Sequence, residues 1–389
     1  MRPRAQGRAL LEVAKDFAKG GFLPARRVML EVFAVPTCFV QFDHAVRVGG
    51  YPTERFSLVH GPSNEGKTAF VLGLIKSFLA AGGLALYIDA ERTTPITWVA
   101  QLMGVLADHP FFFAHKPTTY EATIEHVRVF LNLLANLRAK GKIAKNAKAI
   151  VVCDSLRKLV PAGLMDEIIK NEKELAKPGK KITAGRDRAG QIRGKMNAAW
   201  MDELVPLLDH AGAAFVAIGR EMVDPDNTND WAKKAGNNYK IGGGGAIYFD
   251  SSLVARVQRW GWVQQKRGEN EAPDVYGERH RVTIKKTKVG GKDGKVTDCA
   301  FFTSNGRLIP LGFDRARDVL ELGERFEVVE KGNKGWLLWR DEAWNGMHKA
   351  TVDLSAAPTL LAELEAEVRA KFKEHKPVEY DDETGEVEG

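Results

Sequence analysis

The chain has 389 residues, a hydrophobic content of 44% and a formal net charge of +7. This length and apolar content exclude a chain that is disordered throughout and allow one large α/β domain with smaller attachments. No apolar run approaches the roughly 20 residues of a transmembrane helix, and the three cysteines are too far apart for a disulfide framework or a zinc site. The sequence therefore favours a cytoplasmic protein without a membrane partner, and its basic balance favours a polyanionic partner.

Residues 1–35 are expected to form a basic N-terminal segment around one short helix. The helix is predicted over residues 9–18, where apolar side chains recur at helical spacing, at Leu10, Val13, Ala14 and Phe17. Arginines and lysines surround this stripe. The helix either packs on its own domain or docks on a neighbouring subunit, and the spacing does not decide between the two. A membrane-surface helix is less favoured because acidic residues interrupt the basic face.

The region from residue 36 to residue 312 alternates apolar runs with helical patterns. The runs that predict buried parallel strands lie at 56–61, 84–91, 149–155 and 213–219. The stretches with helical periodicity lie at 68–80, 121–139 and 195–209. This alternation predicts a doubly wound α/β sheet. Two later runs, at 281–289 and 299–304, lack intervening helices and predict antiparallel strands added at one sheet edge.

Two long polar stretches interrupt this pattern, at residues 162–194 and 221–245. The first is rich in charged residues and glycine, and the second ends in four consecutive glycines. Long loops inside a compact domain are usually functional or disordered. After residue 313 the pattern becomes a helical run, a hairpin and a second helix, at 314–322, 326–339 and 357–372. We therefore expect a small C-terminal domain over residues 313–375 and an acidic, disordered tail over residues 376–389.

The segment between Gly61 and Thr68 carries the strongest chemical signal. Its residues, Gly61, Pro62, Ser63, Asn64, Glu65, Gly66, Lys67 and Thr68, match the phosphate-binding pattern GxxxxGK[ST] completely. An apolar strand precedes the motif and an apolar-periodic helix that includes Ala69 follows it, so a chance match in a glycine-rich turn is disfavoured. The glycines let the backbone wrap around phosphates. We expect Lys67 to reach the β- and γ-phosphates of a nucleotide and the Thr68 hydroxyl to bind Mg²⁺.

Carboxylates follow two of the predicted strands. Asp154 ends the run at 149–153, and an acid at the tip of a buried parallel strand suits the Mg²⁺ side of a phosphate site. A helix cap would be the simpler interpretation if no phosphate loop preceded it. Hydrolysis also needs a group that orients the attacking water, for which Glu91 is the candidate. Asp89 is the rival position, and an exposed strand end is the purely structural alternative for Glu91.

Lys286 and Lys288 lie two residues apart in the predicted strand at 281–289. Strand alternation puts both on one face, where cations would neutralise charge that develops during phosphoryl transfer. A solvated basic edge strand explains the same spacing at least as well. The spacing alone therefore does not assign these lysines to a site.

Basic residues and aromatic rings gather in and beside the two polar stretches. The candidates for contact with nucleic acid are Arg186, Arg188, Arg193 and Lys195 at the first stretch, and Trp231, Lys233, Lys234 and Lys240 at the second. Cations follow the phosphates of a strand while rings stack on its bases. The alternative is a pair of solvated surface loops, and the acidic residues of the first stretch give that alternative weight.

Taken in order, these segments resemble the RecA family, and more narrowly phage recombinases of the UvsX kind. The phosphate loop is shared by many families, but the order IDAE, VVCDS, GGGGAIYFDSS and KKTKV is much more specific. The resemblance covers roughly residues 36–312. It implies a RecA-like P-loop ATPase core, a twisted and mostly parallel sheet with helices on both faces. It also implies an N-terminal oligomerisation helix and a small α+β C-terminal domain.

The resemblance implies roles for residues around the phosphate loop. Lys67 and Thr68 match the residues that hold phosphate and Mg²⁺, and Asp154 matches the Mg²⁺-side aspartate. Glu91 matches the catalytic glutamate, which favours it over its rival. An aromatic residue of the family usually stacks on adenine, and Trp98 is the residue here that has a suitable ring. The implied cofactors are ATP and Mg²⁺.

Other implied roles involve neighbouring subunits and DNA. Lys286 and Lys288 match lysines that reach into the neighbouring subunit's ATP site, which would place the active site between subunits. The stretches 162–194 and 221–245 match the two DNA-binding loops. One departure concerns Arg220, which stands where the family usually has a glutamine that senses the γ-phosphate. Arg220 could instead contact phosphate directly, and the usual route from ATP to the second loop lacks its glutamine here.

The function that this resemblance implies is that of an ATP-dependent DNA recombinase and DNA-dependent ATPase. Such a protein forms filaments on single-stranded DNA and promotes homologous pairing and strand exchange with double-stranded DNA. Expected partners are therefore both forms of DNA, further copies of the chain in a filament or a ring, and a single-strand-binding protein and loader, in a bacterial or phage-infected cytoplasm. The alternatives are a hexameric helicase on the same core and an ATP-gated coat that protects single strands without pairing them.

Overall fold

The computed structural model describes residue 19 and residues 32–117, 119–144, 146–164, 186–224, 238–242, 245–265, 271–290 and 297–372. The chain divides into two compact units, Met1–Phe33 and Ala34–Gly389, and every element named below belongs to the second. The helix predicted at residues 9–18 and the tail predicted at 376–389 lie outside the described residues, so these two expectations stay predictions.

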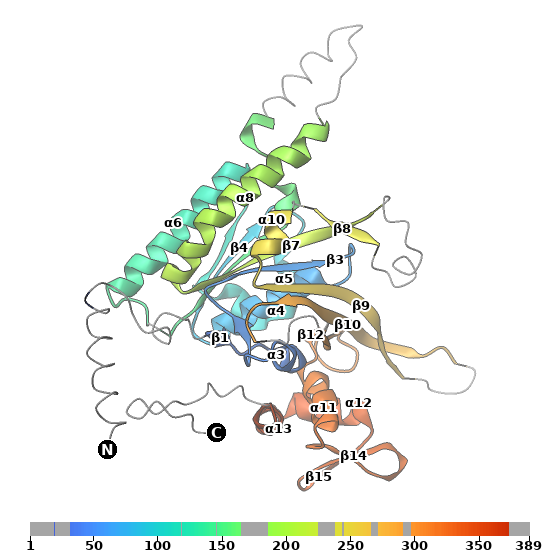
Figure 1. Ribbon diagram of the computed structural model, residues 1–389. Helices are drawn as coiled ribbons and strands as arrows, with labels where there is room; N and C mark the ends of the chain where they lie inside the picture. The colour runs from blue at the N-terminus through green and yellow to red at the C-terminus, as the bar shows by residue number, and fades with distance from the viewer. Residues whose placement is uncertain are drawn as a thin grey trace, which may run out of the picture. The chain divides into compact units, whose positions relative to one another are not determined.

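A large sheet organises the second unit (Figure 1). Its strands are β3 (Phe56–Gly61), β4 (Leu84–Asp89), β5 (Phe112–His115), β6 (Ala149–Asp154), β7 (Ala213–Val223), β9 (Leu253–Gln265), β10 (Asp274–Thr287), β11 (Thr297–Ser304) and β12 (Gly312–Phe313). Their order in the described part of the sheet is β12-β11-β10-β9-β3-β7-β6-β4-β5. From β9 to β5 the neighbours run parallel, and from β9 to β12 they run antiparallel. The mostly parallel sheet with an antiparallel extension at one edge is thereby confirmed.

Short strands lie beside this sheet. The strand β8 (Tyr239–Ile241) pairs antiparallel with the end of β7, and β1 (Ala34–Val35) pairs with β2 (Tyr51–Pro52). The prediction of one loop over residues 221–245 was therefore wrong at its ends, because backbone pairing extends β7 to Val223 and forms β8. The first polar stretch was also predicted too long, since a helix already begins at Arg186.

Helices cover both faces of the sheet, as predicted (Figure 1). They are α3 (Val40–Val46), α4 (Lys67–Ala80), α5 (Ile96–Met103), α6 (Tyr120–Ala139), α8 (Arg186–Ala211) and α10 (Gly245–Asp250), with short 3₁₀ turns at Gly104–Asp108 and Leu156–Lys158. The helices α6, α8 and α10 bury apolar side chains with β3, β4, β6 and β7 in one core cluster. The helix α4 packs on the opposite face, with α3 and α5 beside it. This layering leaves the carboxyl ends of the parallel strands open at one edge, where ligands of α/β sheets bind.

The helix α6 shows how the local sequence decides these elements. Its cap is Thr119, whose side-chain oxygen accepts a hydrogen bond from the N–H of Ala122 at 3.2 Å. Its buried positions then recur at helical spacing through Tyr120, Thr123, Val127 and Leu131. The face that packs on the sheet is therefore already visible in the sequence, and α6 agrees with the helix predicted at 121–139 to within one residue.

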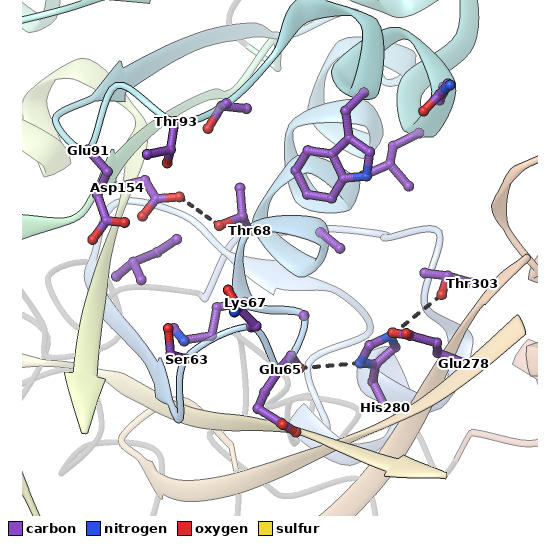
Figure 2. Close-up of a pocket in the computed structure, with 18 of the residues that line it drawn as sticks. Ser63, Glu65, Lys67, Thr68, Glu91, Thr93, Asp154, Glu278, His280 and Thr303 are labelled. Carbon is purple, nitrogen blue, oxygen red and sulfur yellow. Dashed lines mark hydrogen bonds and ion pairs between the residues drawn. The ribbon is translucent and has the colours of Figure 1, made fainter. Parts of the chain in front are cut away.

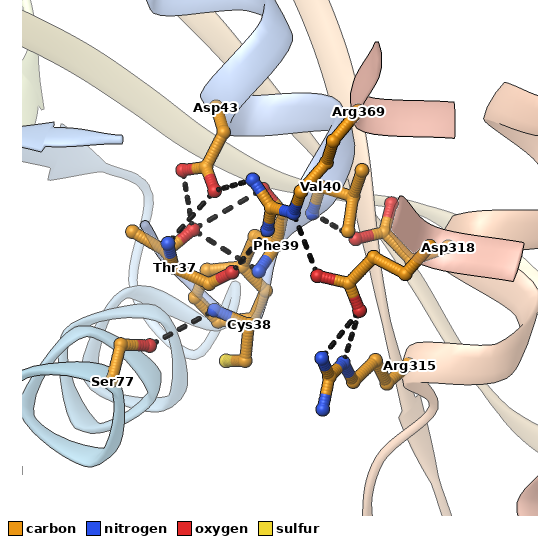
Figure 3. A network of polar contacts seen from close by, with 10 residues as sticks. Thr37, Cys38, Phe39, Val40, Asp43, Ser77, Arg315, Asp318 and Arg369 are labelled. Atoms are coloured by element: carbon orange, nitrogen blue, oxygen red, sulfur yellow. Dashed lines mark hydrogen bonds and ion pairs between the residues drawn. The ribbon is translucent and has the colours of Figure 1, made fainter. Parts of the chain in front are cut away.

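Residues after β12 form a smaller arrangement with its own hydrophobic core. Its elements are α11 (Arg315–Arg325), β13 (Glu330–Lys331), a 3₁₀ turn (Asn333–Gly335), β14 (Trp336–Trp339), β15 (Glu342–Asn345), α12 (Met347–Ala356) and α13 (Pro358–Ala370). The sequence predicted α11 and α13 but neither α12 nor the third strand. Val40 of α3 belongs to this core, and Figure 3 shows polar contacts that tie α3 to α11 and α13. The domain boundary at residue 313 stays a prediction. Within the described residues no helix is long and apolar enough to span a bilayer.

Candidate active site

The phosphate loop connects the end of β3 with the start of α4 at the open edge of the sheet (Figure 2). A Cβ atom on Gly61 would lie 2.1 Å from the carbonyl oxygen of Val257, and a Cβ atom on Gly66 would lie 2.5 Å from Nδ1 of His280. Gly66 also has a φ of +96°, which side-chain-bearing residues rarely adopt. The helix begins at Lys67, so the unpaired N–H groups of its first turn lie at the loop. The loop is thus built for an anion.

Thr68, Asp154 and Tyr87 form a hydrogen-bonded cluster beside this loop. The Thr68 hydroxyl donates to Oδ2 of Asp154 at 2.8 Å, and the Tyr87 hydroxyl donates to the same oxygen at 3.1 Å. Burial raises the pKa of Asp154 to about 6, although the hydrogen bond from Thr68 opposes this rise. The cluster offers hydroxyl and carboxylate oxygens, the ligand types that Mg²⁺ prefers.

The two rival acids after β4 have different surroundings. Asp89 is 4% exposed and accepts a hydrogen bond from the backbone N–H of Arg92 at 2.8 Å, so it closes a turn. Glu91 lines the cavity and accepts a hydrogen bond from the Ser155 hydroxyl at 2.8 Å. A carboxylate that faces the cavity is better placed to orient water than one that holds a turn. The geometry therefore favours Glu91 over Asp89.

Two cations lie at the same place. The Lys67 ammonium group donates to the carbonyl oxygen of Pro62. Burial lowers the pKa of Lys67, while the negative charges of Asp154 and Glu91 act in the opposite direction. Arg220 of β7 lies beside Gly61 of β3 in the sheet register and also lines the cavity. Positive charge therefore faces the space from the start of helix α4 and from strand β7.

A cavity of about 500 Å³ lies beside the loop. Of the residues predicted for the site, it brings together Ser63, Asn64, Glu65, Gly66, Lys67, Thr68, Ala69, Glu91, Trp98, Asp154 and Arg220. Gly61 and Pro62 complete the loop but do not line the cavity. Leu102 and Leu311 line the same cavity as Trp98 and supply apolar surface, which suits the base of a nucleotide. Phosphate, metal and base could therefore be held in one space.

Several residues of this cavity were not predicted from the sequence, namely Ser155, Glu278, His280 and Thr303, and neither was the Asp154 partner Tyr87. His280 stacks on the Phe301 ring with 4.5 Å between centroids, and its Nδ1 lies 3.3 Å from the carbonyl oxygen of Glu65. It thus supports the phosphate loop from β10. Burial lowers the pKa of His280. Tyr87 could have been found, because it lies two residues before Asp89 on the same face of β4.

Lys286 and Lys288 lie on one face of the chain at the end of β10, as the alternation predicts. Their ammonium groups both donate to the carbonyl oxygen of Phe249, at 2.7 and 2.9 Å, and that of Lys286 also donates to the carbonyl oxygen of Tyr248 at 2.7 Å. They thus cap the last turn of α10 and do not line the cavity of their own chain. A role in the site of another copy stays a prediction.

The candidate DNA contacts are only partly within the described structure. Arg193 is half-buried and Lys195 is exposed, both on α8, and Lys240 of β8 forms an ion pair with Asp224 at 2.8 Å. Arg186 and Arg188 fall in the first turn of α8, but their side chains lie outside the described residues, as do Trp231, Lys233 and Lys234 entirely. The structure therefore leaves the DNA-binding assignment a prediction.

Comparison with known proteins agrees with this geometry. The family model described as the RecA N-terminal domain matches residues 4–179. The relatives include Protein RecA of Salinispora tropica, 26% identical over 379 residues that cover 95% of this chain and 92% of that protein. Protein RecA of Enterococcus mundtii is 24% identical, with 99% and 97% covered, and Protein RecA of Clostridium tetani is 26% identical, with 94% and 90% covered.

Proposed function

We propose that this chain, which belongs to the RecA family, is a DNA recombinase that couples ATP hydrolysis to pairing of single-stranded DNA with a homologous duplex. The observation that carries the proposal is one cavity that joins a complete phosphate loop, the Thr68–Asp154 pair and Glu91. Relatives that align over almost the whole chain support extension of the family's activity to this protein.

The phosphate loop and its cations would bind and stabilise the triphosphate. The N–H groups at the start of α4 and the Lys67 ammonium would neutralise the phosphates, and Arg220 would add charge on the γ-phosphate side. Glu91, held by Ser155, would orient the attacking water. Trp98 would stack on the base.

The same residues fit a magnesium ion bound with the nucleotide. Thr68 and Asp154 present a hydroxyl and a carboxylate oxygen that lie 2.8 Å apart, and both are hard oxygen ligands. Water and phosphate oxygens would complete the coordination shell of the ion. When bound, the ion would neutralise charge on the phosphates. Burial raises the pKa of Asp154, and a bound cation would favour the ionised form that this role requires.

Assembly into a filament is supported by an apolar edge of the sheet. The edge strand β5, the residue before it and the helix α6 expose large apolar side chains, namely Phe111, Phe113, Val129 and Leu133. Unpaired strand edges and contiguous apolar surface are typical of protein–protein contacts. We propose that a second copy of the chain covers this edge, and that Lys286 and Lys288 act at its ATP site.

A strand-exchange assay tests the proposed function. The full chain, ATP and Mg²⁺ are incubated with single-stranded DNA and either a homologous or an unrelated duplex, and joint molecules are counted on a gel. We expect joint molecules only with the homologous duplex, and none with Lys67→Ala. Binding of single strands without joint molecules would indicate a protective coat. Unwinding of a duplex in the absence of a homologous strand would indicate a helicase.

A further inference from the structure

A tyrosine hydroxyl lies behind the carboxylate on the magnesium side of the cavity. Tyr87 of β4 is 4% exposed, and its hydroxyl donates a hydrogen bond to Oδ2 of Asp154 at 3.1 Å. The same hydroxyl lies 2.9 Å from the hydroxyl of Thr94. Tyr87 does not line the cavity. Any part that it has in the site therefore acts through Asp154.

The number of available protons fixes the direction of these hydrogen bonds. An ionised carboxylate only accepts, and a tyrosine hydroxyl has one proton to donate. Because Tyr87 donates its proton to Asp154, the hydroxyl of Thr94 must donate to the oxygen of Tyr87. We call Thr94, Tyr87 and Asp154 the hydroxyl chain. Hydrogen bonds in series polarise one another, so the donation from Thr94 strengthens the bond from Tyr87 to the carboxylate.

Both donors to Asp154 reach the same carboxylate oxygen. Thr68 donates to Oδ2 from the start of α4, and Tyr87 donates to Oδ2 from β4. Among the described residues no donor reaches Oδ1, which is open to the cavity that Asp154 lines. Thr68 alone is a weak anchor, because its hydroxyl oxygen is also a proposed ligand of the ion. The second donor holds the carboxylate in one orientation, with Oδ1 ready for a cation or for water bound to it.

The hydroxyl of Tyr87 is not needed to hold β4 against β6. The backbone of β4 pairs with β6 over Leu84–Asp89. The N–H groups of Ala90 and Glu91 then donate to the carbonyl oxygen of Asp154, at 2.8 and 3.1 Å. Loss of the hydroxyl alone should therefore leave both strands and the Tyr87 ring in place, while it releases the carboxylate.

Thr94 connects the hydroxyl chain to the wall of the cavity. Thr93 and Thr94 line the cavity between the end of β4 and the start of α5. Figure 2 shows Thr93 and Glu91 on the same side of the cavity as Asp154. The hydroxyl chain thus begins beside the proposed water-orienting glutamate and ends on the metal side. It lies where a small change in carboxylate orientation would alter how a cation is held.

We propose that Tyr87, held by Thr94, is a positioning residue that presents the Asp154 carboxylate to the divalent cation bound with ATP and so sets the affinity of the site for Mg²⁺. The inference rests on the nucleotide site of the proposed function, but it needs no DNA. Residues that orient a metal-side ligand change metal affinity by roughly 10–100-fold when they are lost. Because Tyr87 would touch neither the ion nor ATP, excess Mg²⁺ should overcome its loss.

The test measures how much Mg²⁺ contributes to nucleotide binding by the full chain. Calorimetry gives the dissociation constant of the non-hydrolysable ATP analogue AMP-PNP in EDTA and in Mg²⁺, and the ratio of the two constants is that contribution. The rate of ATP hydrolysis at rising Mg²⁺ concentration and the melting temperature without nucleotide are measured alongside.

The variants are Tyr87→Phe and Thr94→Val, with Tyr120→Phe as the matched control. The Tyr120 hydroxyl is also buried and donates to the side chain of Asn197. Tyr120 packs in the core with α6 and α8 and does not line the cavity. The control therefore removes a buried, hydrogen-bonded hydroxyl that has no contact with the metal side.

We expect Tyr87→Phe to lower the ratio by about 10-fold and to leave the affinity for AMP-PNP in EDTA unchanged. The Mg²⁺ concentration for half-maximal hydrolysis should rise by about 10-fold, while the rate at saturating Mg²⁺ stays close to that of the wild type. Thr94→Val should act in the same direction by a smaller factor, and Tyr120→Phe should leave the ratio unchanged.

A lower melting temperature of Tyr87→Phe with an unchanged ratio would show a purely structural hydroxyl and overturns the proposal. If Tyr87→Phe does not fold, an unchanged ratio in Thr94→Val overturns it. A wild type that binds AMP-PNP equally well in Mg²⁺ and in EDTA overturns it too. Failure of the proposed function is a separate result, in which the wild type binds AMP-PNP more tightly with Mg²⁺ but forms no joint molecules.

Discussion

Two regions of this molecule bury charged groups, and they differ in what surrounds those groups. At the junction of α3, α11 and α13 (Figure 3), Asp43 is fully buried and accepts hydrogen bonds from the backbone and side chain of Thr37, both at 2.7 Å, and from Arg369 at 2.8 Å. Asp318 accepts one from the backbone of Val40 at 2.6 Å. At the cavity (Figure 2), Asp154 is also buried, yet it lies at a wall of open space.

A shifted pKa does not by itself mark a functional group in this molecule. Burial raises the pKa of Asp43 to about 7 and that of Asp154 to about 6. The first acid holds two parts of the fold together, and the second faces a space that a ligand can enter. The difference between the two acids is that Asp154 lies at a cavity on which other polar groups converge, whereas Asp43 does not. The junction should therefore govern stability, and the cavity should govern activity.

The largest effect is expected from Arg369→Ala at the junction. This change leaves the buried Asp43 without its cation and leaves Glu365 with Arg315 as its remaining partner, so the free energy of unfolding should fall by about 3–5 kcal/mol. Urea denaturation measures the loss. Arg340→Ala is the matched control, because Arg340 pairs with Glu367 of α13 at the surface, where ion pairs contribute little. Equal loss in both variants would show that the junction is not the stabilising element described here.

The next effect is expected from Lys67→Ala at the cavity. Loss of a cation aimed at the transferring phosphoryl group should lower the ATP hydrolysis rate by roughly 10²–10³-fold or more. The melting temperature without nucleotide should change little, since among the described residues Lys67 donates a hydrogen bond only to the loop carbonyl group of Pro62. If Lys67→Ala lowered the melting temperature but not the hydrolysis rate, the cavity would govern stability rather than activity, which contradicts the difference proposed between the two regions.

A smaller effect is expected from Trp98→Ala. Loss of a ring that stacks on the base should raise the KM for ATP by about 10-fold with little change in kcat, as base–aromatic stacking is worth roughly 1–3 kcal/mol. Trp336→Ala serves as the control, because Trp336 is 39% exposed and lies outside the cavity. An unchanged KM for ATP in Trp98→Ala would show that the base does not bind at this part of the cavity.

The smallest effect is a change in the pH dependence of stability at the junction. Because the pKa of Asp43 is raised to about 7 in the fold, the folded state holds this proton over a pH range where the unfolded state has lost it. The contribution of Asp43 to stability is therefore full below the unfolded pKa and is lost as the pH rises through about 7. The melting temperature of the wild type relative to Asp43→Asn should fall between about pH 5 and about pH 8. A constant or rising difference would contradict the raised pKa.

Much of the fold was predictable because short-range patterns decide it. The run at 56–61 coincides with β3, and the helix after the phosphate loop begins one residue before its predicted start, at Lys67. The end of β7 was missed because Arg220 and Glu221 read as a polar strand end. In the structure a distant Arg256 and the pairing with β8 bury Glu221. Local secondary-structure propensity could not reveal these partners of Glu221, because strands that are distant in the sequence bring them together.

The site was predictable to a similar degree. The loop, Asp154 and Glu91 each belong to a local pattern, and the structure places them at one cavity. His280 could not be found, because it comes from β10, more than two hundred residues beyond the loop that it supports. The first turns of α8 read as a loop since they are polar and contain glycine, and α12 shows only a weak apolar stripe. Tertiary packing decides these elements.

The most direct test of the central claim is ATP hydrolysis with and without single-stranded DNA, for the wild type and Glu91→Gln. The account predicts that DNA stimulates hydrolysis by the wild type. It also predicts that Glu91→Gln lowers the rate by about 10²-fold or more and still binds DNA in the presence of ATP. Hydrolysis that is indifferent to DNA, or a fully active Glu91→Gln, would contradict the account.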